Sequence, residues 1–202
     1  MIKFLKILMI LVLVALLGLI GWLYFYKKSI TWPENMNFGE YRPYILGTEI
    51  DFSKSGNSAE FVSTDNGWGG QEKKFRCTVG KNTTTKLYIK NGANKDMELK
   101  FEAFGIYPEI EGERIIDVYA NGKKIKTIKL VEKSIYTAKI PSEVMSNDKL
   151  DLRFYTSNPY KHPGGNRKLG MAVHSIKISN DYGLKTKRKI ARWIKNNLLT
   201  QD

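Results

Sequence analysis

The sequence predicts a mainly β protein: an antiparallel two-sheet β-sandwich of the jelly-roll type, with an N-terminal transmembrane helix and a short C-terminal basic amphipathic helix. Three observations predict it. Residues 7–26 carry no charged side chain, short stretches that alternate polar and apolar residues fill 47–180, and apolar residues recur at helical spacing near the C-terminus. The length of 202 residues fits one folded domain with a tail at each end. The expected parts are a membrane anchor (1–28), a connector (29–46), the β-sandwich (47–180) and the basic helix (181–202).

The uncharged run 7–26 predicts a membrane anchor. At about 1.5 Å per residue, a helix of this length spans about 30 Å, which matches the hydrocarbon core of a bilayer. Trp22, Tyr24 and Tyr26 lie at its C-terminal end, and aromatic side chains favour the headgroup level. The run exceeds a signal-peptide core and no small-residue cleavage site follows, which favours an uncleaved anchor. We expect a single-pass protein of the cell (inner) membrane whose main domain is external or periplasmic.

Alternating stretches through the middle of the chain predict half-buried strands. Asn121-Gly122 separates two of them and predicts a tight hairpin, because both residue types tolerate positive φ. No long helical period lies between the stretches, which argues against a parallel βαβ sheet and favours an antiparallel sandwich. The predicted strands are 48–52, 60–62, 74–79, 86–90, 97–104, 115–120, 124–130, 135–140, 150–155 and 169–178, and 141–144 is typical of one helical turn or a loop.

The segment 185–199 predicts a basic amphipathic helix, with Ile190, Trp193, Ile194 and Leu198 at helical spacing. Such a helix beside a membrane anchor can lie on anionic lipid. It can equally pack its apolar stripe on its own domain or on a partner, and the sequence leaves both interpretations open. The candidate membrane-surface residues are Lys187, Arg188, Arg192, Trp193 and Lys195.

The net charge of +13 does not predict nucleic-acid binding, because its distribution is uneven. The excess divides as +4 in 1–28, +5 in 29–180 and +4 in 181–202, so the two short ends carry most of it. One cysteine excludes an internal disulfide framework and multi-cysteine metal sites. We expect no nucleic-acid partner, no metal and no cofactor.

Catalysis finds no support in the sequence. No nucleophile elbow, zincin motif, Walker loop or dinucleotide fingerprint occurs. We interpret His174 as a structural or surface histidine of a strand, and His162 lies in a loop between prolines. The sequence therefore predicts a protein that is not an enzyme.

A binding role has a candidate in the loop 64–72, where one tryptophan stands among glycines and polar residues. A flat indole in such a loop suits stacking against the apolar face of a sugar, with nearby oxygens free to bond hydroxyls. Alternatively, the indole folds back and plugs one end of the sandwich, or the loop oxygens ligate a structural Ca²⁺. The candidate ligand-binding residues are Trp68, Asp65, Asn66 and Glu72, with Tyr160, His162 and Arg167 from a second loop.

Three separated pieces of the chain stand out: 67–81, the hairpin 118–122 and 166–178. Together they resemble a small β-sandwich domain of bacterial cell-envelope proteins. That domain often follows glycosyltransferase or related polysaccharide-biosynthesis modules, and its function is unknown. The resemblance covers about residues 60–180, and it implies a carbohydrate-related accessory or binding role, with Arg167 and Gly170 important for the closing strand.

We therefore expect a membrane-anchored, non-catalytic β-sandwich that binds or scaffolds cell-envelope carbohydrate or its biosynthetic machinery. The expected partners are the cell membrane and an envelope glycan. The alternative is a protein–protein interaction module that holds a membrane-protein partner through the sandwich face or the C-terminal helix.

Overall fold

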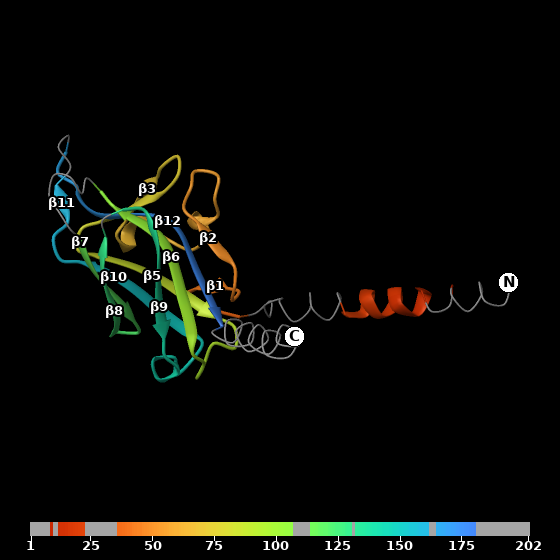
Figure 1. Cartoon of the computed structure of the whole chain (residues 1–202). Coiled ribbons are helices and arrows are strands. Elements are labelled where there is room, and N and C mark those ends of the chain that lie inside the picture. The colour runs from red at the N-terminus through yellow and green to blue at the C-terminus, as the bar shows by residue number, and fades with distance from the viewer. Residues whose placement is uncertain are drawn as a thin grey trace, which may run out of the picture. The chain divides into compact units, whose positions relative to one another are not determined.

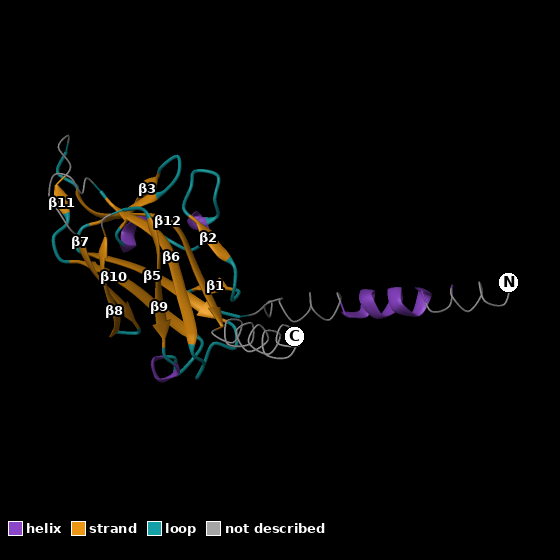
Figure 2. Cartoon of the chain, in the orientation of Figure 1, coloured by secondary structure: helices purple, strands orange, loops and turns teal. Residues whose placement is uncertain are grey.

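The computed structural model describes residues 9, 12–22, 36–106, 114–130, 132–161 and 165–180. The chain divides into two compact units, Met1–Asn37 and Phe38–Asp202. Figure 2 shows that strands make up most of the second unit. The predicted basic helix, with its membrane-surface residues Lys187, Arg188, Arg192, Trp193 and Lys195, lies outside the described residues.

Within the first unit, Met9 and residues 12–22 are helical, and their apolar side chains are mostly exposed. In the described part of the chain no helix is long and apolar enough to cross a membrane. The remaining residues of the predicted span 7–26 lie outside that part. The membrane anchor stays a prediction.

The second unit contains two β-sheets, which form the two layers seen in Figure 1. We call the five-stranded sheet sheet A and the seven-stranded sheet sheet B. Sheet A has the order β1 (Arg42–Tyr44), β5 (Asn82–Ile89), β10 (Lys149–Thr156), β7 (Arg114–Ala120) and β8 (Lys123–Leu130). Sheet B has the order β3 (Trp68–Gln71), β4 (Arg76–Val79), β12 (Lys168–Asn180), β6 (Met97–Gly105) and β9 (Ser134–Ile140), and β2 (Glu49–Asp51) and β11 (Tyr160–Lys161) also pair with β12.

The predicted two-sheet sandwich is confirmed, and its sheets are mainly antiparallel. β1 departs from the expected pattern, because it pairs in parallel with β5. Every second residue of β5, β6 and β10 is buried. The alternating sequences predict this for β6, β10 and the second half of β5, whereas residues 82–85 extend β5 beyond the predicted strand. The buried positions of both sheets meet in one core that includes Leu87, Leu99, Ile116, Leu152 and Ile176.

Tyr44 ties the edge strand of sheet A to sheet B. Its hydroxyl accepts a hydrogen bond from the Ile178 backbone N–H at 2.8 Å and donates to the Thr48 carbonyl. Burial raises the pKa of Tyr44 to about 12, so this hydroxyl stays protonated. Its strand, β1, lies inside the segment 29–46 that the sequence predicts to be a connector.

The Asn121-Gly122 hairpin is confirmed, with φ values of 47° and 82°. The Asn121 amide donates to the carbonyls of Val144, at 2.7 Å, and Lys149, at 3.0 Å. Its carbonyl oxygen accepts from the backbone N–H of Asp151 at 2.7 Å. The turn between β7 and β8 is therefore pinned to β10 and to the segment that precedes it.

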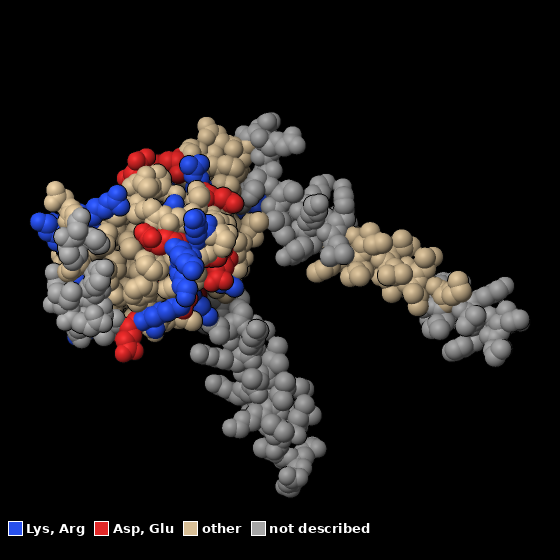
Figure 3. Space-filling model, turned by 90° about the horizontal axis from the view of Figure 1, so that it is seen from above, with Lys and Arg blue, Asp and Glu red and all other residues tan. Residues whose placement is uncertain are grey.

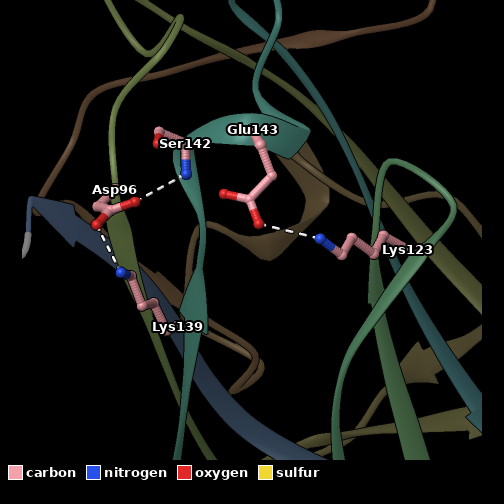
Figure 4. Close-up of polar contacts among 5 residues, drawn as sticks. All are labelled: Asp96, Lys123, Lys139, Ser142 and Glu143. Carbon is pink, nitrogen blue, oxygen red and sulfur yellow. Dashed lines mark hydrogen bonds and ion pairs between the residues drawn. The ribbon is translucent and has the colours of Figure 1, made fainter.

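The segment after β9, for which the sequence left a helical turn or a loop open, contains the 3₁₀ helix η3 (Ser142–Val144). Figure 4 shows the polar contacts around it. The Asp96 carboxylate accepts from the Ser142 N–H at 2.8 Å and pairs with Lys139 at 2.6 Å. Glu143 pairs with Lys123 at 3.0 Å.

Other local predictions differ from the structure. The stretch 60–62, predicted as a strand, instead begins with the last residue of the 3₁₀ helix η1 (Ser58–Glu60), and Phe61 and Val62 reach the core from the turn after it. The loop predicted over 64–72 contains the 3₁₀ helix η2 (Thr64–Asn66) and the strand β3. Two of the four residues of β3 are glycines, which have no side chain. The strand therefore lacks the alternation of polar and apolar residues by which a strand is predicted from sequence.

Charged side chains of both signs lie among one another on the face of the folded unit shown in Figure 3. This face therefore offers no uniformly basic surface. Among the described residues, six lysines of this unit form ion pairs with carboxylates within 4 Å. The pairs are Lys86–Glu40, Lys100–Glu98, Lys123–Glu143, Lys124–Asp117, Lys133–Glu102 and Lys139–Asp96.

Candidate functional site

Trp68, the proposed sugar-stacking residue, lies in the core with 1% of its surface exposed. It pairs with Thr78, which faces the interior, so Trp68 faces inward as well. Its ring stacks on Phe52 at 4.6 Å between centroids and meets Phe154 edge-on. The indole N–H donates to the Thr84 carbonyl at 3.1 Å. Of the two interpretations, the structure shows the tryptophan that fills the sandwich, and no face of the indole is open to a sugar.

The polar residues of the same loop remain on the surface but do not surround an aromatic ring. Asp65 and Asn66 are exposed in η2, where the Ser63 hydroxyl accepts from the Asp65 N–H at 3.3 Å. Glu72 is exposed after β3. Burial, with the Glu72 carboxylate as a second cause, raises the pKa of the Cys77 thiol to about 11. Among the described residues no group of three or more His, Cys, Asp or Glu side chains is placed to hold a metal ion.

Tyr160 and Arg167 flank one hairpin, but only Arg167 is exposed. Tyr160 is 5% exposed and packs under the guanidinium of Arg114, 5.5 Å from the ring centroid. Arg114 is fully buried and donates to the carbonyls of Asn158 and Ile106. Tyr160 is therefore part of a structural contact between β11 and β7. His162 lies outside the described residues.

A different group of aromatic side chains meets on the outer face of sheet B. We call Phe75, Phe104 and His174 the aromatic cluster. Phe75 and Phe104 are 5.3 Å apart between ring centroids, and His174 lies 5.9 Å from Phe75 and 5.5 Å from Phe104. All three are half-buried. They come from the turn before β4, from β6 and from β12, and the chain brings them together through the sheet.

A β-bulge in β12 places His174 in this cluster. Val173 pairs with Ala103, but the next pair along the two strands is Ser175 with Glu102. His174 is thus an extra residue without a partner on β6, and a bulge of this kind re-aims a side chain. Val173 and Ile176 remain in the core on either side.

Ala172 shows how closely the cluster covers the sheet. It pairs with Cys77 on β4 and with Phe104 on β6, both on the outer face. Nevertheless it is fully buried, although it does not belong to the core between the sheets. We attribute its burial to the rings of Phe75 and Phe104, because they converge over this part of β12.

A cleft of about 390 Å³ adjoins the aromatic cluster. Ser175 pairs with Asp51 on one side and with Glu102 on the other, and Glu102 pairs with Ile135. This row crosses four neighbouring strands, or about 14 Å at about 4.8 Å per strand. We call the cleft itself the sheet B cleft. Its lining residues are Glu49, Asp51, Ser53, Lys74, Glu102, Lys133, His174 and Ser175.

Two of the three carboxylates in the sheet B cleft are held by neighbours. Glu102 pairs with the Lys133 ammonium at 3.1 Å. Asp51 accepts from the Ser53 N–H at 2.8 Å and from its hydroxyl at 3.0 Å. Fixed carboxylate and ammonium groups of this kind are suited to hydrogen-bonding a polar ligand.

Burial lowers the pKa of His174, and the nearby Lys133 ammonium lowers it further. Glu102 and a hydrogen bond to the Lys74 backbone act in the opposite direction but do not cancel the effect. The imidazole is therefore neutral at neutral pH, and it offers a flat, uncharged ring beside the two phenylalanines. A flat apolar surface next to a polar cleft can bind a ligand that has an apolar face and a hydroxylated edge.

Sequence reasoning missed this site, although one signal was present. In β6 the positions that face the core hold Met97, Leu99 and Phe101. The alternate positions, on the outer face, hold the polar residues Glu98, Lys100 and Glu102. Phe104 occupies the next outer-face position in this series, so it is an aromatic residue on the outer face. No sequence pattern revealed that Phe75 and His174 meet it there, because that depends on strand pairing and on the bulge.

No protein-family model matches the sequence, and no curated protein matches it. Among solved structures, a family GH115 4-O-methyl-α-glucuronidase with specificity for decorated arabinogalactans is similar at 12% identity and a TM-score of 0.41. The alignment covers 74% of this chain and 19% of that one. A family 35 carbohydrate-binding module from an environmental isolate is similar at 13% identity and a TM-score of 0.35, over 67% of this chain and 84% of that one. The CBM22-2 xylan-binding domain of Paenibacillus barcinonensis Xyn10C is similar at 14% identity and a TM-score of 0.33, over 66% of this chain and 98% of that one.

Proposed function

We propose that the folded unit is a non-catalytic carbohydrate-binding domain whose site is the outer face of sheet B. The observation that supports the proposal is the meeting of the aromatic cluster with the polar sheet B cleft. Likeness at TM-scores between 0.33 and 0.41 carries no argument about function, so the proposal rests on the site's own residues.

The chemistry of the two surfaces fits a sugar. The C–H face of a pyranose is apolar and packs on an aromatic ring, while its hydroxyls need hydrogen-bond partners. The rings of Phe75 and Phe104 supply the first surface. Ser175, Lys74 and the carboxylates of the cleft supply the second.

The extent of the proposed site, the sheet B cleft together with Ile135 beside it, suits a short oligosaccharide. The row from Asp51 through Ser175 and Glu102 to Ile135 extends about 14 Å across the strands, which exceeds the size of one sugar ring. Ile135 is 66% exposed at the far end of this row, where it adds an apolar contact. We infer that the ligand lies across the strands and is held along its length.

Membrane anchoring through 7–26 and an origin of the ligand in the cell envelope are further parts of the proposal. They rest on the uncharged N-terminal run and on the resemblance to envelope domains. The alternative, a module that docks on a membrane protein, rests chiefly on the basic C-terminal segment 185–199.

The proposal is tested by isothermal titration calorimetry of the full chain against β-linked hexasaccharides of glucose, xylose and N-acetylglucosamine and against soluble peptidoglycan fragments. Saturable binding of at least one of them, weakened in Phe104→Ala, is the expected result. If none binds to the folded protein, the carbohydrate proposal is wrong, and crosslinking of a membrane partner becomes the next experiment.

A further inference from the structure

We infer that a ligand in the sheet B cleft competes with a proton for His174, so that the affinity of the site falls as the medium becomes acidic. This inference rests on the proposed function and adds a regulation of the same site. It is carried by the packing of the imidazole against two aromatic rings and by the charges that surround it.

The packing of the ring comes first. The His174 imidazole lies 5.5 Å from the Phe104 ring and 5.9 Å from the Phe75 ring, between centroids. These contacts remove water from the imidazole. A charged imidazolium needs that water more than the neutral ring does, so the cluster favours the neutral form.

The surrounding charges come from every element that packs against the ring. Lys74, in the turn between β3 and β4, and Lys133, next to β9, both oppose a positive charge on His174. Glu102 on β6 favours such a charge, but it is already paired with Lys133 at 3.1 Å. Asp51 and Glu49 on β2 line the same cleft, and Asp51 is engaged by Ser53.

A ligand that covers the cluster removes still more water from the imidazole. It therefore binds better to the neutral form than to the charged form, and by linkage it lowers the pKa of His174 further. Between the pKa of the free protein and that of the complex, the affinity falls by up to about tenfold per pH unit. Above this range the affinity is constant.

The experiment measures affinity by calorimetry between about pH 8 and about pH 5, the range in which a histidine changes charge. The probe is whichever β-linked hexasaccharide of glucose, xylose or N-acetylglucosamine binds the full chain at neutral pH. We expect roughly three- to tenfold weaker binding at the acidic end than at neutral pH. His174→Gln binds more weakly than the wild type, but its affinity no longer changes with pH.

A second readout needs no ligand. The chain has two histidines, so the imidazole signals in an NMR titration are assigned with His162→Gln. His174 should titrate below the ordinary histidine value, and Phe75→Ala should raise its pKa by opening the ring to water.

The outcomes separate the two proposals. Binding that is unchanged across the range, or a His174 pKa that Phe75→Ala does not move, overturns the inference and leaves carbohydrate binding standing. Absence of binding at every pH overturns the proposed function and this inference with it.

Discussion

Phe75 and Phe104 meet edge-on, with their ring centroids 5.3 Å apart, on the face of sheet B that points away from the core. They belong to segments on either side of β12, and Ala172 lies between those segments in the pairing of the strands. A larger residue at 172 would hold the two rings apart. The small residue and the bulge at His174 together build an aromatic surface where an ordinary strand would present isolated polar side chains.

Removal of either phenylalanine should weaken glycan binding without unfolding the protein. Phe75→Ala and Phe104→Ala each remove one ring of the cluster, and we expect a loss of about tenfold in affinity, or about 1.4 kcal/mol. The contact between the rings contributes about 0.5–1.5 kcal/mol to folding stability beyond the burial of each ring, and that burial is only partial here. Calorimetry measures the first effect and urea denaturation the second.

Tyr119→Ala is the matched control for this pair. Tyr119 is a half-buried aromatic residue on the outer face of the other sheet, where the Arg153 guanidinium lies 4.2 Å from its ring centroid. Its removal should leave glycan affinity unchanged. An equal loss in Tyr119→Ala would mean that general destabilisation, and not the cluster, explains the effect.

Trp68→Ala should destabilise the fold instead of removing a binding contact. The residue is 1% exposed, stacks on Phe52 and satisfies its N–H within the core. Truncation of a buried tryptophan costs about 3–5 kcal/mol. The free energy of unfolding, measured in urea, tests this, with the exposed Asp65→Ala as the variant that should show little change. Stability equal to wild type in Trp68→Ala would contradict the burial of the indole.

Gly170→Ala should also destabilise the protein, because β12 has no room for a side chain at this position. A Cβ at this position would lie 2.4 Å from the hydroxyls of both Thr78 and Thr156. Thr78 also accepts a hydrogen bond from the Met171 N–H at 2.9 Å, so it is not free to move. Overpacking of this kind costs about 1–3 kcal/mol. Thr156→Ala should recover part of the loss in the double variant, and its failure to do so would argue against the clash as the cause.

The sequence predicted those parts of the fold in which local pattern and burial coincide. The alternation of β5, β6 and β10 and the Asn121-Gly122 turn were all confirmed. The short strand β3 was not predicted, because glycines interrupt its alternation of polar and apolar residues. The pairing of β12 with β2, β4 and β6 could not be predicted, because it joins segments far apart in the chain.

The site was harder to predict than the fold. The sequence pointed to Trp68 because a tryptophan among glycines is typical of an exposed loop, yet its pairing with Thr78 turns it inward. The residues that form the outer surface gave one weak signal, Phe104 among the outer-face positions of β6. His174 depends on a bulge, and bulges leave no reliable trace in a single sequence.

Acid should weaken the contacts around η3 that Figure 4 shows. A hydrogen bond from Lys139 lowers the pKa of Asp96, and one from Lys123 lowers the pKa of Glu143. Both carboxylates are therefore more acidic in the folded state than in the unfolded state. Their stabilising contribution is present above the unfolded pKa values and is lost as the pH falls through the lower folded values.

The measurement is the urea midpoint as a function of pH for the wild type and for the double variant Asp96→Asn, Glu143→Gln. The wild type should lose more stability than the double variant as the pH falls below about 4, where carboxylates protonate. Identical pH profiles would show that these two ion pairs do not contribute to acid sensitivity.

The central claim is that the outer face of sheet B is the binding surface, and NMR chemical-shift mapping of the full chain with a bound hexasaccharide tests it most directly. The account predicts that the largest changes fall on Phe75, Phe104, His174 and Ser175. Changes confined to Asp65, Asn66 and Arg167 would mean that the binding site lies in the loops and not on sheet B. An absence of saturable changes would contradict carbohydrate binding itself.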